Sequence, residues 1–117
     1  MSSHHNINYI EFPSHDLPAS QAFFEHVFDW QFESYGPTYI AFRDGKGMDG
    51  GFYHSTQNSH STAGAPLVIL YSEQLEATRT KVSNAGGEIL KDIFVFPGGR
   101  RFHFQEPGGN EIAVWSE

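Results

Sequence analysis

Three side chains are suited to acid–base chemistry: Glu11 near the start of the chain, and His103 and Glu111 near its end. Glu11 lies in an apolar stretch, where a carboxylate could serve as a general base or anchor a cationic or hydroxylated ligand. It could instead form a structural ion pair with Arg100 or Arg101. His103 could act as a general acid or base because imidazole changes charge near neutral pH, or it could donate a hydrogen bond to Glu11.

Carboxylate and imidazole groups also bind divalent metal ions. Glu11, His103 and Glu111 could therefore form a metal site together, although their spacing does not show whether they converge. The chain has no cysteine. Disulfides, thiolate metal sites and a cysteine nucleophile are thereby excluded.

Glu11 lies in an expected strand over residues 7–12, which is rich in Ile, Tyr and Phe and is ended by Pro13. Asp16 is of a type that caps helices, and an amphipathic helix over residues 19–28 follows it. Polar turn residues then separate three short strands, at residues 30–34, 39–43 and 51–54. The first half therefore predicts the element order β-α-β-β-β.

The second half of the chain repeats the first at low identity. Aligned positions are Tyr9 with Leu67, Ile10 with Val68, Phe12 with Leu70, and residues 39–42 with residues 101–104. The same element order is expected there, at residues 67–71, 72–85 (a helix capped by Ser72), 88–96, 101–105 and 111–115. We therefore predict an α+β fold with a single domain over residues 1–117, in which a linker at about 56–65 joins module one (about 6–55) to module two (about 66–117).

Charge and hydropathy restrict the partners of this chain. The net charge is −7 with only seven Lys and Arg residues, so nucleic acid and anionic membranes are poor partners. No apolar run approaches the roughly 18 residues of a membrane span. The first residues lack the basic and apolar regions of a signal peptide, and we expect a cytoplasmic location.

The pattern resembles the vicinal oxygen chelate superfamily, which includes glyoxalase I, extradiol dioxygenases, fosfomycin-resistance enzymes and bleomycin-resistance proteins. The residues that carry the resemblance are Asp16–Ser20, Phe23–Phe24, Val27–Trp30 and the ending Phe104–Ile112. In that family the ending usually reads F-x-D-P-x-G-N, and Glu106 stands in place of the Asp here. The resemblance implies two βαβββ modules that form a cup-shaped sheet with the helices outside.

Metal-dependent members of that superfamily bind one divalent cation through two residues from each module. By resemblance, the usual ligand positions here are Tyr9, Gly51, Leu67 and Ala113. Gly, Leu and Ala have no coordinating side chain, and a neutral Tyr is a rare ligand. We therefore expect the usual metal site to be vacant and no cofactor to be bound, unless a divalent metal uses a non-standard site.

The side chains expected to line the cup, by alternation around those positions, are Tyr9, Glu11, Tyr53, Arg101, His103, Glu111 and Trp115. The aromatic members could form a flat apolar pocket or simply fill the cup. The resemblance then favours a glyoxalase-like protein that binds or sequesters a small, partly aromatic ligand, and it favours a homodimer. The alternative is a lyase, isomerase or dioxygenase-like enzyme that uses Glu11 and His103 as catalytic residues, with or without a rearranged metal site. A third interpretation is an interaction module with a filled cup.

Overall fold

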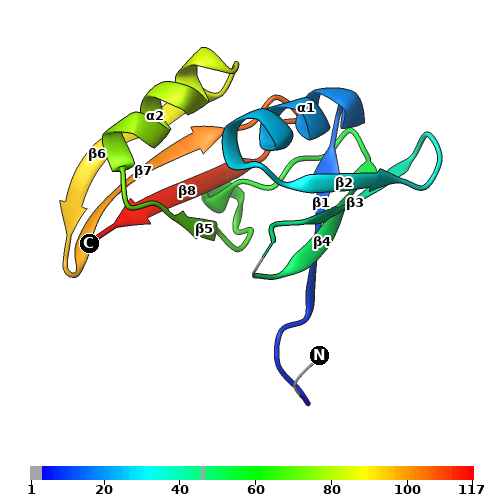
Figure 1. Cartoon of the computed structure of the whole chain (residues 1–117), viewed down its shortest axis with the longest axis horizontal. Helices are drawn as coiled ribbons and strands as arrows, with labels where there is room; N and C mark the ends of the chain where they lie inside the picture. Colours follow the sequence, from blue (N-terminus) through cyan, green and yellow to red (C-terminus); the bar gives the residue numbers. More distant parts are fainter. Residues whose placement is uncertain (1–3, 46) are drawn as a thin grey trace.

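The structure, a computed structural model, describes residues 4–45 and 47–117. The first half contains β1 (Tyr9–Ser14), α1 (Leu17–Phe28), β2 (Gln31–Ser34), β3 (Tyr39–Arg43) and β4 (Asp49–His54). The second half contains β5 (Val68–Tyr71), α2 (Leu75–Asn84), β6 (Glu88–Phe96), β7 (Gly99–Gln105) and β8 (Glu111–Ser116). A short 3-10 helix (Ser61–Ala63) lies in the connection between the halves (Figure 1). The predicted β-α-β-β-β order is confirmed in both.

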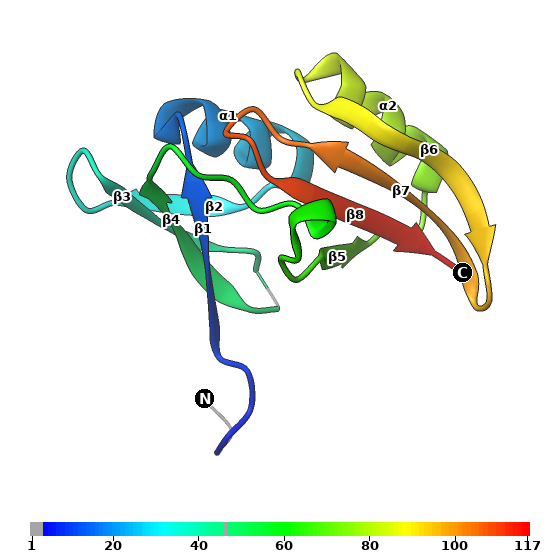
Figure 2. The same ribbon diagram turned by 180° about the vertical axis from the view of Figure 1, so that it is seen from behind.

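The strands form two separate four-stranded sheets. Sheet A has the order β1-β4-β3-β2, and sheet B has the equivalent order β5-β8-β7-β6. In each sheet the first and last strands of the module pair in parallel, and the other neighbours are antiparallel. The predicted α+β fold with two βαβββ modules is therefore confirmed, and the two sheets do not close into one barrel (Figure 2).

The internal repeat of the sequence is reproduced in the strand register. Ala41 lies opposite Gly51 in sheet A, and His103 lies opposite Ala113 in sheet B. Glu11 is the neighbour of Gly51 on its other side. The aligned positions of the two halves are thus structurally equivalent, and His103 occupies in sheet B the place that Ala41 occupies in sheet A.

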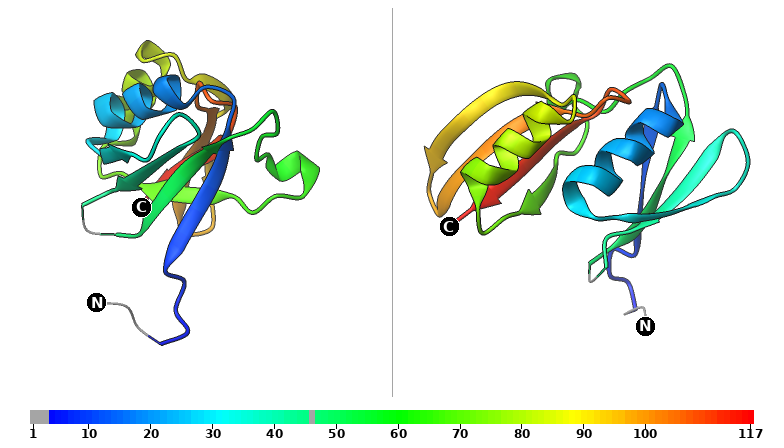
Figure 3. Two further views of the ribbon diagram at one scale, coloured as in Figure 1. Left: turned by 90° about the vertical axis from the view of Figure 1, so that its right-hand side faces the viewer. Right: turned by 45° about the horizontal axis from the view of Figure 1, so that its top comes forward.

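Helix α1 joins the two modules into one hydrophobic core. Its first turn is capped by Asp16, whose side chain accepts a hydrogen bond from the Ala19 amide at 3.1 Å. Phe24 packs on Phe52 of sheet A with ring centroids 5.4 Å apart. The preceding Phe23 packs on the helix-facing side of sheet B, and the buried apolar residues of both modules form a single cluster. Figure 3 shows α1 and α2 on the same side of the two sheets.

Helix α2 begins at Leu75, two residues later than a helix capped by Ser72 would. Ser72 was expected to cap it, but the Ser72 hydroxyl accepts from the Gln74 amide at 3.0 Å and so stabilises the turn that precedes the helix.

Within the part of the chain that the structure describes, no helix is long and apolar enough to cross a membrane.

A buried carboxylate, that of Glu106, takes part in the hydrogen bonds that connect the β7–β8 turn to module one. Glu106 is fully buried and accepts hydrogen bonds from the Ser20 hydroxyl, the Gly108 amide and the Asn110 side chain at 2.7–2.8 Å. Asn110 also donates to the Pro13 carbonyl at 2.6 Å. Burial raises the pKa of Glu106, although these hydrogen bonds oppose the shift. The family motif around residues 104–110 therefore has a structural role at the junction of the modules.

Candidate functional site

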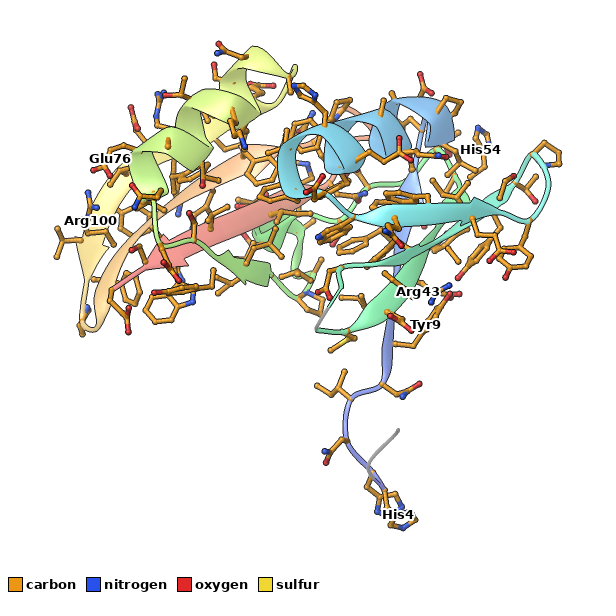
Figure 4. The ribbon with its side chains drawn as sticks, viewed as in Figure 1. His4, Tyr9, Arg43, His54, Glu76 and Arg100 are labelled. Atoms are coloured by element: carbon orange, nitrogen blue, oxygen red, sulfur yellow. The ribbon has the colours of Figure 1, made fainter. Side chains whose placement is uncertain are left out.

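Each sheet has one face covered by helices and an opposite face, which we call its open face, although on sheet B His103, Glu111 and Ala113 of that face are buried. In sheet A the residues on the covered face, such as Phe12, Phe42 and Phe52, are buried. Because side chains alternate along a strand, their neighbours project from the opposite face. Figure 4 shows Tyr9 and Arg43 extending on that face, away from α1.

The register arranges the open face of sheet A into three rows that run across the strands. The first row contains Gln31, Arg43, Asp49 and Tyr9. The middle row contains Glu33, Ala41, Gly51 and Glu11. The third row contains Tyr39, Tyr53 and Pro13. Two small residues, Ala41 and Gly51, therefore lie between two glutamates at the centre of this face.

A groove of about 630 Å³ opens over this part of sheet A. Side chains of both charges and three tyrosines surround it, and Ala41 contributes to its floor. The residues that line it are Tyr9, Gln31, Phe32, Glu33, Tyr35, Tyr39, Ala41, Phe42, Arg43, Asp49 and Gly50. The volume falls in the range of sites that hold small organic molecules.

A chain of hydrogen bonds connects Glu11 to the groove. The Tyr39 hydroxyl donates to the Glu11 carboxylate at 2.9 Å, and the hydroxyls of Tyr39 and Tyr9 are 2.6 Å apart. Burial, together with the hydrogen bonds to Tyr9 and Glu11, raises the pKa of Tyr39 well above its usual range. Glu11 is exposed and does not itself line the groove. We call this hydrogen-bonded series Glu11–Tyr39–Tyr9 the tyrosine chain.

The open face of sheet B holds a buried histidine–carboxylate pair. His103 Nδ1 lies 2.8 Å from Glu111 Oε2, and both side chains are at most 5% exposed. The other oxygen of Glu111 accepts from the amide and the hydroxyl of Ser61, both at 2.7 Å. Burial alone would raise the pKa of Glu111, but the hydrogen bonds from His103 and Ser61 outweigh it and lower the value to about 2. A residue of the expected linker thus supports this pair.

The two arginines considered as partners of Glu11 bind elsewhere, so the predicted ion pair is wrong. Arg100 forms a salt bridge with Glu76 of α2, and Figure 4 shows these two side chains next to each other. The Arg101 guanidinium lies over the rings of Phe94 and Phe96, 5.4 and 5.3 Å from their centroids. Because Glu11 is exposed, water solvates its charge and no ion pair is required.

The seven residues expected in the cup are divided between the two sheets. Sheet A carries Tyr9, Glu11 and Tyr53, whereas sheet B carries Arg101, His103, Glu111 and Trp115. Within residues 4–45 and 47–117, no three His, Asp or Glu side chains gather in a way that could hold a metal ion. The combination of Glu11, His103 and Glu111 considered from the sequence is therefore not assembled within this chain.

The usual metal-ligand positions of the resembled superfamily do not fit a metal ion here. Gly51 and Ala113 offer no side-chain donor, and Leu67 precedes β5. A Cβ atom on Gly51 would collide with the hydroxyl of Tyr39. A tyrosine ring thus fills the space into which a ligand side chain at residue 51 would project.

Sequence reasoning missed Tyr39, the central member of the tyrosine chain, and it missed the floor residue Ala41. The internal repeat held a signal for both, because they are the equivalents of Arg101 and His103, which were predicted to face the cup. Arg43 and Glu33 were missed as well. They share the face of Ala41 through simple alternation along β3 and across to β2.

Comparisons with known proteins agree with the observed fold. A sequence model described as the Glyoxalase/Bleomycin resistance protein/Dioxygenase superfamily matches residues 6–114. No curated protein matches the chain in a sequence search. A glyoxalase/bleomycin resistance protein/dioxygenase family enzyme from Burkholderia phytofirmans PsJN superposes with a TM-score of 0.76 at 15% identity, covering 93% of this chain and 96% of that one.

Two further solved structures show the same fold. A glyoxalase-related enzyme from Fulvimarina pelagi has a TM-score of 0.76 at 19% identity, over 97% of this chain and 88% of its own. A lactoylglutathione lyase from Agrobacterium tumefaciens has a TM-score of 0.73 at 16% identity, over 98% and 96%. At these identities the similarity shows the fold alone.

Proposed function

The chain belongs to the Glyoxalase/Bleomycin resistance protein/Dioxygenase superfamily, and we propose that it binds a small, partly aromatic molecule in the groove of sheet A without the usual metal ion. The observation that carries this proposal is the groove itself, about 630 Å³ in volume and bordered by Tyr9, Tyr35 and Tyr39. Aromatic walls with a few polar groups are typical of small-molecule sites. The ligand would lie over Ala41 with its flat part against the tyrosines.

The polar groups of the groove would fix the orientation of the ligand. Arg43 and Asp49 occupy neighbouring register positions at one end, and no ion pair joins them within the described parts of the chain. Neither side chain forms an ion pair with another described residue, so both charges are available to interact with a ligand. Tyr9 is the next residue along that row, and its hydroxyl reaches towards the middle row, 2.6 Å from the hydroxyl of Tyr39.

Filling the floor of the groove tests this proposal. Ala41→Leu places a larger side chain where the ligand would lie, whereas Ala77→Leu adds the same group on the exposed surface of α2. Small aromatic probes such as benzamidine, benzamide and benzoate would be titrated by calorimetry. We expect Ala41→Leu to abolish binding and Ala77→Leu to keep it. Equal binding by both variants, or no binding to the unmodified protein, would contradict the proposal.

A homodimer is part of the same proposal. Support comes from large apolar side chains exposed on the open faces, including Tyr53 at 38%, Ile69 at 44% and Tyr71 at 49% exposure. Carboxylates on the open face of sheet A also complement Arg101 on that of sheet B. Sedimentation analysis across a concentration series would test it, and a monomer at all concentrations would reject it. A cytoplasmic location stays a prediction.

An enzymatic function through Glu11 and His103 is the second candidate. The observation in its favour is the His103–Glu111 pair, since a carboxylate that orients an imidazole favours acid–base chemistry. The support is weaker because Glu11 is on the other sheet and His103 Nε2 is buried without a hydrogen-bond partner. Substrate turnover that is lost in both Glu11→Gln and His103→Ala would establish this alternative in place of binding alone.

A further inference from the structure

The hydrogen bonds of the tyrosine chain all run in one direction, from Tyr9 through Tyr39 to Glu11. An ionised carboxylate only accepts hydrogen bonds, so the single hydroxyl proton of Tyr39 is used in the 2.9 Å bond to Glu11. The Tyr39 oxygen can then only accept from Tyr9, whose hydroxyl is 2.6 Å away. The proton of Tyr9 is thereby used as well. What Tyr9 offers to the groove is a lone pair, which means an acceptor and not a donor.

The surroundings of Tyr39 keep this direction stable. The raised pKa of Tyr39 means that its proton stays in place throughout the neutral range. Gly51 provides the space for the ring to reach Glu11, since any side chain there would displace the Tyr39 hydroxyl. The direction is therefore set by Glu11, which lies outside the groove, and is transmitted to Tyr9, which borders it.

The carboxylates that line the groove impose the same requirement on a ligand. Asp49 and Glu33 are acceptors and carry negative charge, and Glu33 already interacts with the Tyr35 hydroxyl. Arg43 is the one Lys or Arg residue among the lining residues that the structure describes. Acceptors and negative charge therefore predominate around the groove, and a ligand that supplies N–H or O–H donors would satisfy them.

We propose that the groove selects a planar, donor-bearing organic ligand, preferably a cationic one such as an amidinium or aromatic amine, and that Glu11 is the positioning residue for this selectivity. This inference rests on the proposed function of the same groove. Glu11 acts through Tyr39 and Tyr9 without touching the ligand. Carboxylate-bearing aromatic molecules, which bring only acceptors, would be rejected.

Three probes of nearly the same shape test the ligand class. Benzamidine is a planar cation with N–H donors, benzamide has donors and an acceptor, and benzoate is an anion with acceptors only. We expect calorimetric affinities to fall in that order, by about three- to tenfold per step as for one hydrogen bond. Benzoate binding as tightly as benzamidine would overturn the inference and leave the binding function intact. Failure of all three probes to bind would overturn the proposed function itself.

The role of Glu11 needs a test that does not depend on its charge. Benzamide and N,N-dimethylbenzamide are both neutral, and only the first has N–H donors. The unmodified protein should prefer benzamide by about three- to tenfold. In Glu11→Gln the side-chain amide can both donate and accept, so Tyr39 is no longer required to donate to residue 11. Tyr39→Phe removes the hydroxyl that connects Glu11 to Tyr9 without changing any charge.

Both variants should lose most of the preference for benzamide over its dimethyl analogue. Thermal unfolding of each variant would establish that the fold is retained. A preference that persists unchanged in Glu11→Gln and Tyr39→Phe would mean that steric exclusion of the methyl groups causes it. That result would overturn the positioning role of Glu11.

Discussion

The hydroxyl of Tyr39 occupies the space into which any side chain at residue 51 would extend, so Gly51 and Tyr39 depend on each other. Residue 51 is one of the positions where related metalloproteins were expected to supply a ligand. In this chain the same space holds the ring that connects Glu11 to Tyr9. The loss of a metal-ligand position and the gain of the tyrosine chain therefore occur at the same place on sheet A.

This dependence predicts the effect of adding a single methyl group. Gly51→Ala should lower the free energy of unfolding by about 1–3 kcal/mol, because the methyl group forces Tyr39 from its position. Denaturant unfolding would measure the change. In the background of Tyr39→Ala the same substitution should have a clearly smaller effect, because only the close approach to the Ile40 carbonyl oxygen at 3.0 Å remains. Equal destabilisation in both backgrounds would show that Tyr39 is not the obstacle.

Metal ions should not stabilise this protein. After treatment with a chelator, titration with Ni²⁺, Zn²⁺, Mn²⁺, Fe²⁺ and Co²⁺ should leave the Tm unchanged, because no suitable cluster exists within the described residues. A specific site occupied at 100 times its Kd would add about 2.7 kcal/mol and shift the Tm by several degrees. A rise that disappears in Glu11→Gln or His103→Ala would reveal a rearranged metal site.

The His103–Glu111 pair should contribute a defined part of the pH dependence of stability. The pKa of Glu111 is lowered from 4.5 to about 2 in the folded state. Its stabilising contribution is therefore fully present above pH 4.5 and is lost as the pH falls towards 2, by up to about 3 kcal/mol. The difference in unfolding free energy between the unmodified protein and Glu111→Gln should shrink over this range. A difference that is constant with pH would contradict the assignment.

The buried Glu106 predicts a cost for an uncharged substitute of the same shape. Both of its oxygens accept hydrogen bonds, from Ser20, Gly108 and Asn110. Glu106→Gln leaves only one acceptor, so one buried donor would face the amide NH₂ group. We expect a loss of about 1–3 kcal/mol in unfolding free energy. Glu73→Gln, at an exposed position, is the matched control and should change stability by much less.

The fold could be predicted well from the sequence, for an identifiable reason. Alternation along strands and the repeat between the halves both depend on local geometry, and the register of Gly51 and Ala113 reproduces the alignment made from sequence. The start of α2 was wrong because Ser72 forms a hydrogen-bonded turn with Gln74 and not a helix cap.

The candidate site could be predicted only in part. Alternation placed Glu11 and His103 on open faces, but periodicity carries no information on whether two sheets face each other. The tyrosine chain was missed because the Tyr39 ring extends over the neighbouring strand and reaches a residue two strands away. That reach depends on the absence of a side chain at Gly51, which is a packing relationship and not a pattern within one strand.

The most direct measurement is a ¹H–¹⁵N NMR titration of the protein with benzamidine. Binding in the groove of sheet A should shift the amide signals of Ala41, Arg43 and Asp49, in a saturable way, and leave those of His103 and Trp115 on sheet B unchanged. Ala41→Leu should abolish these shifts. Saturable shifts confined to sheet B, or no saturable shifts in any residue, would contradict the assignment of the ligand site to this groove.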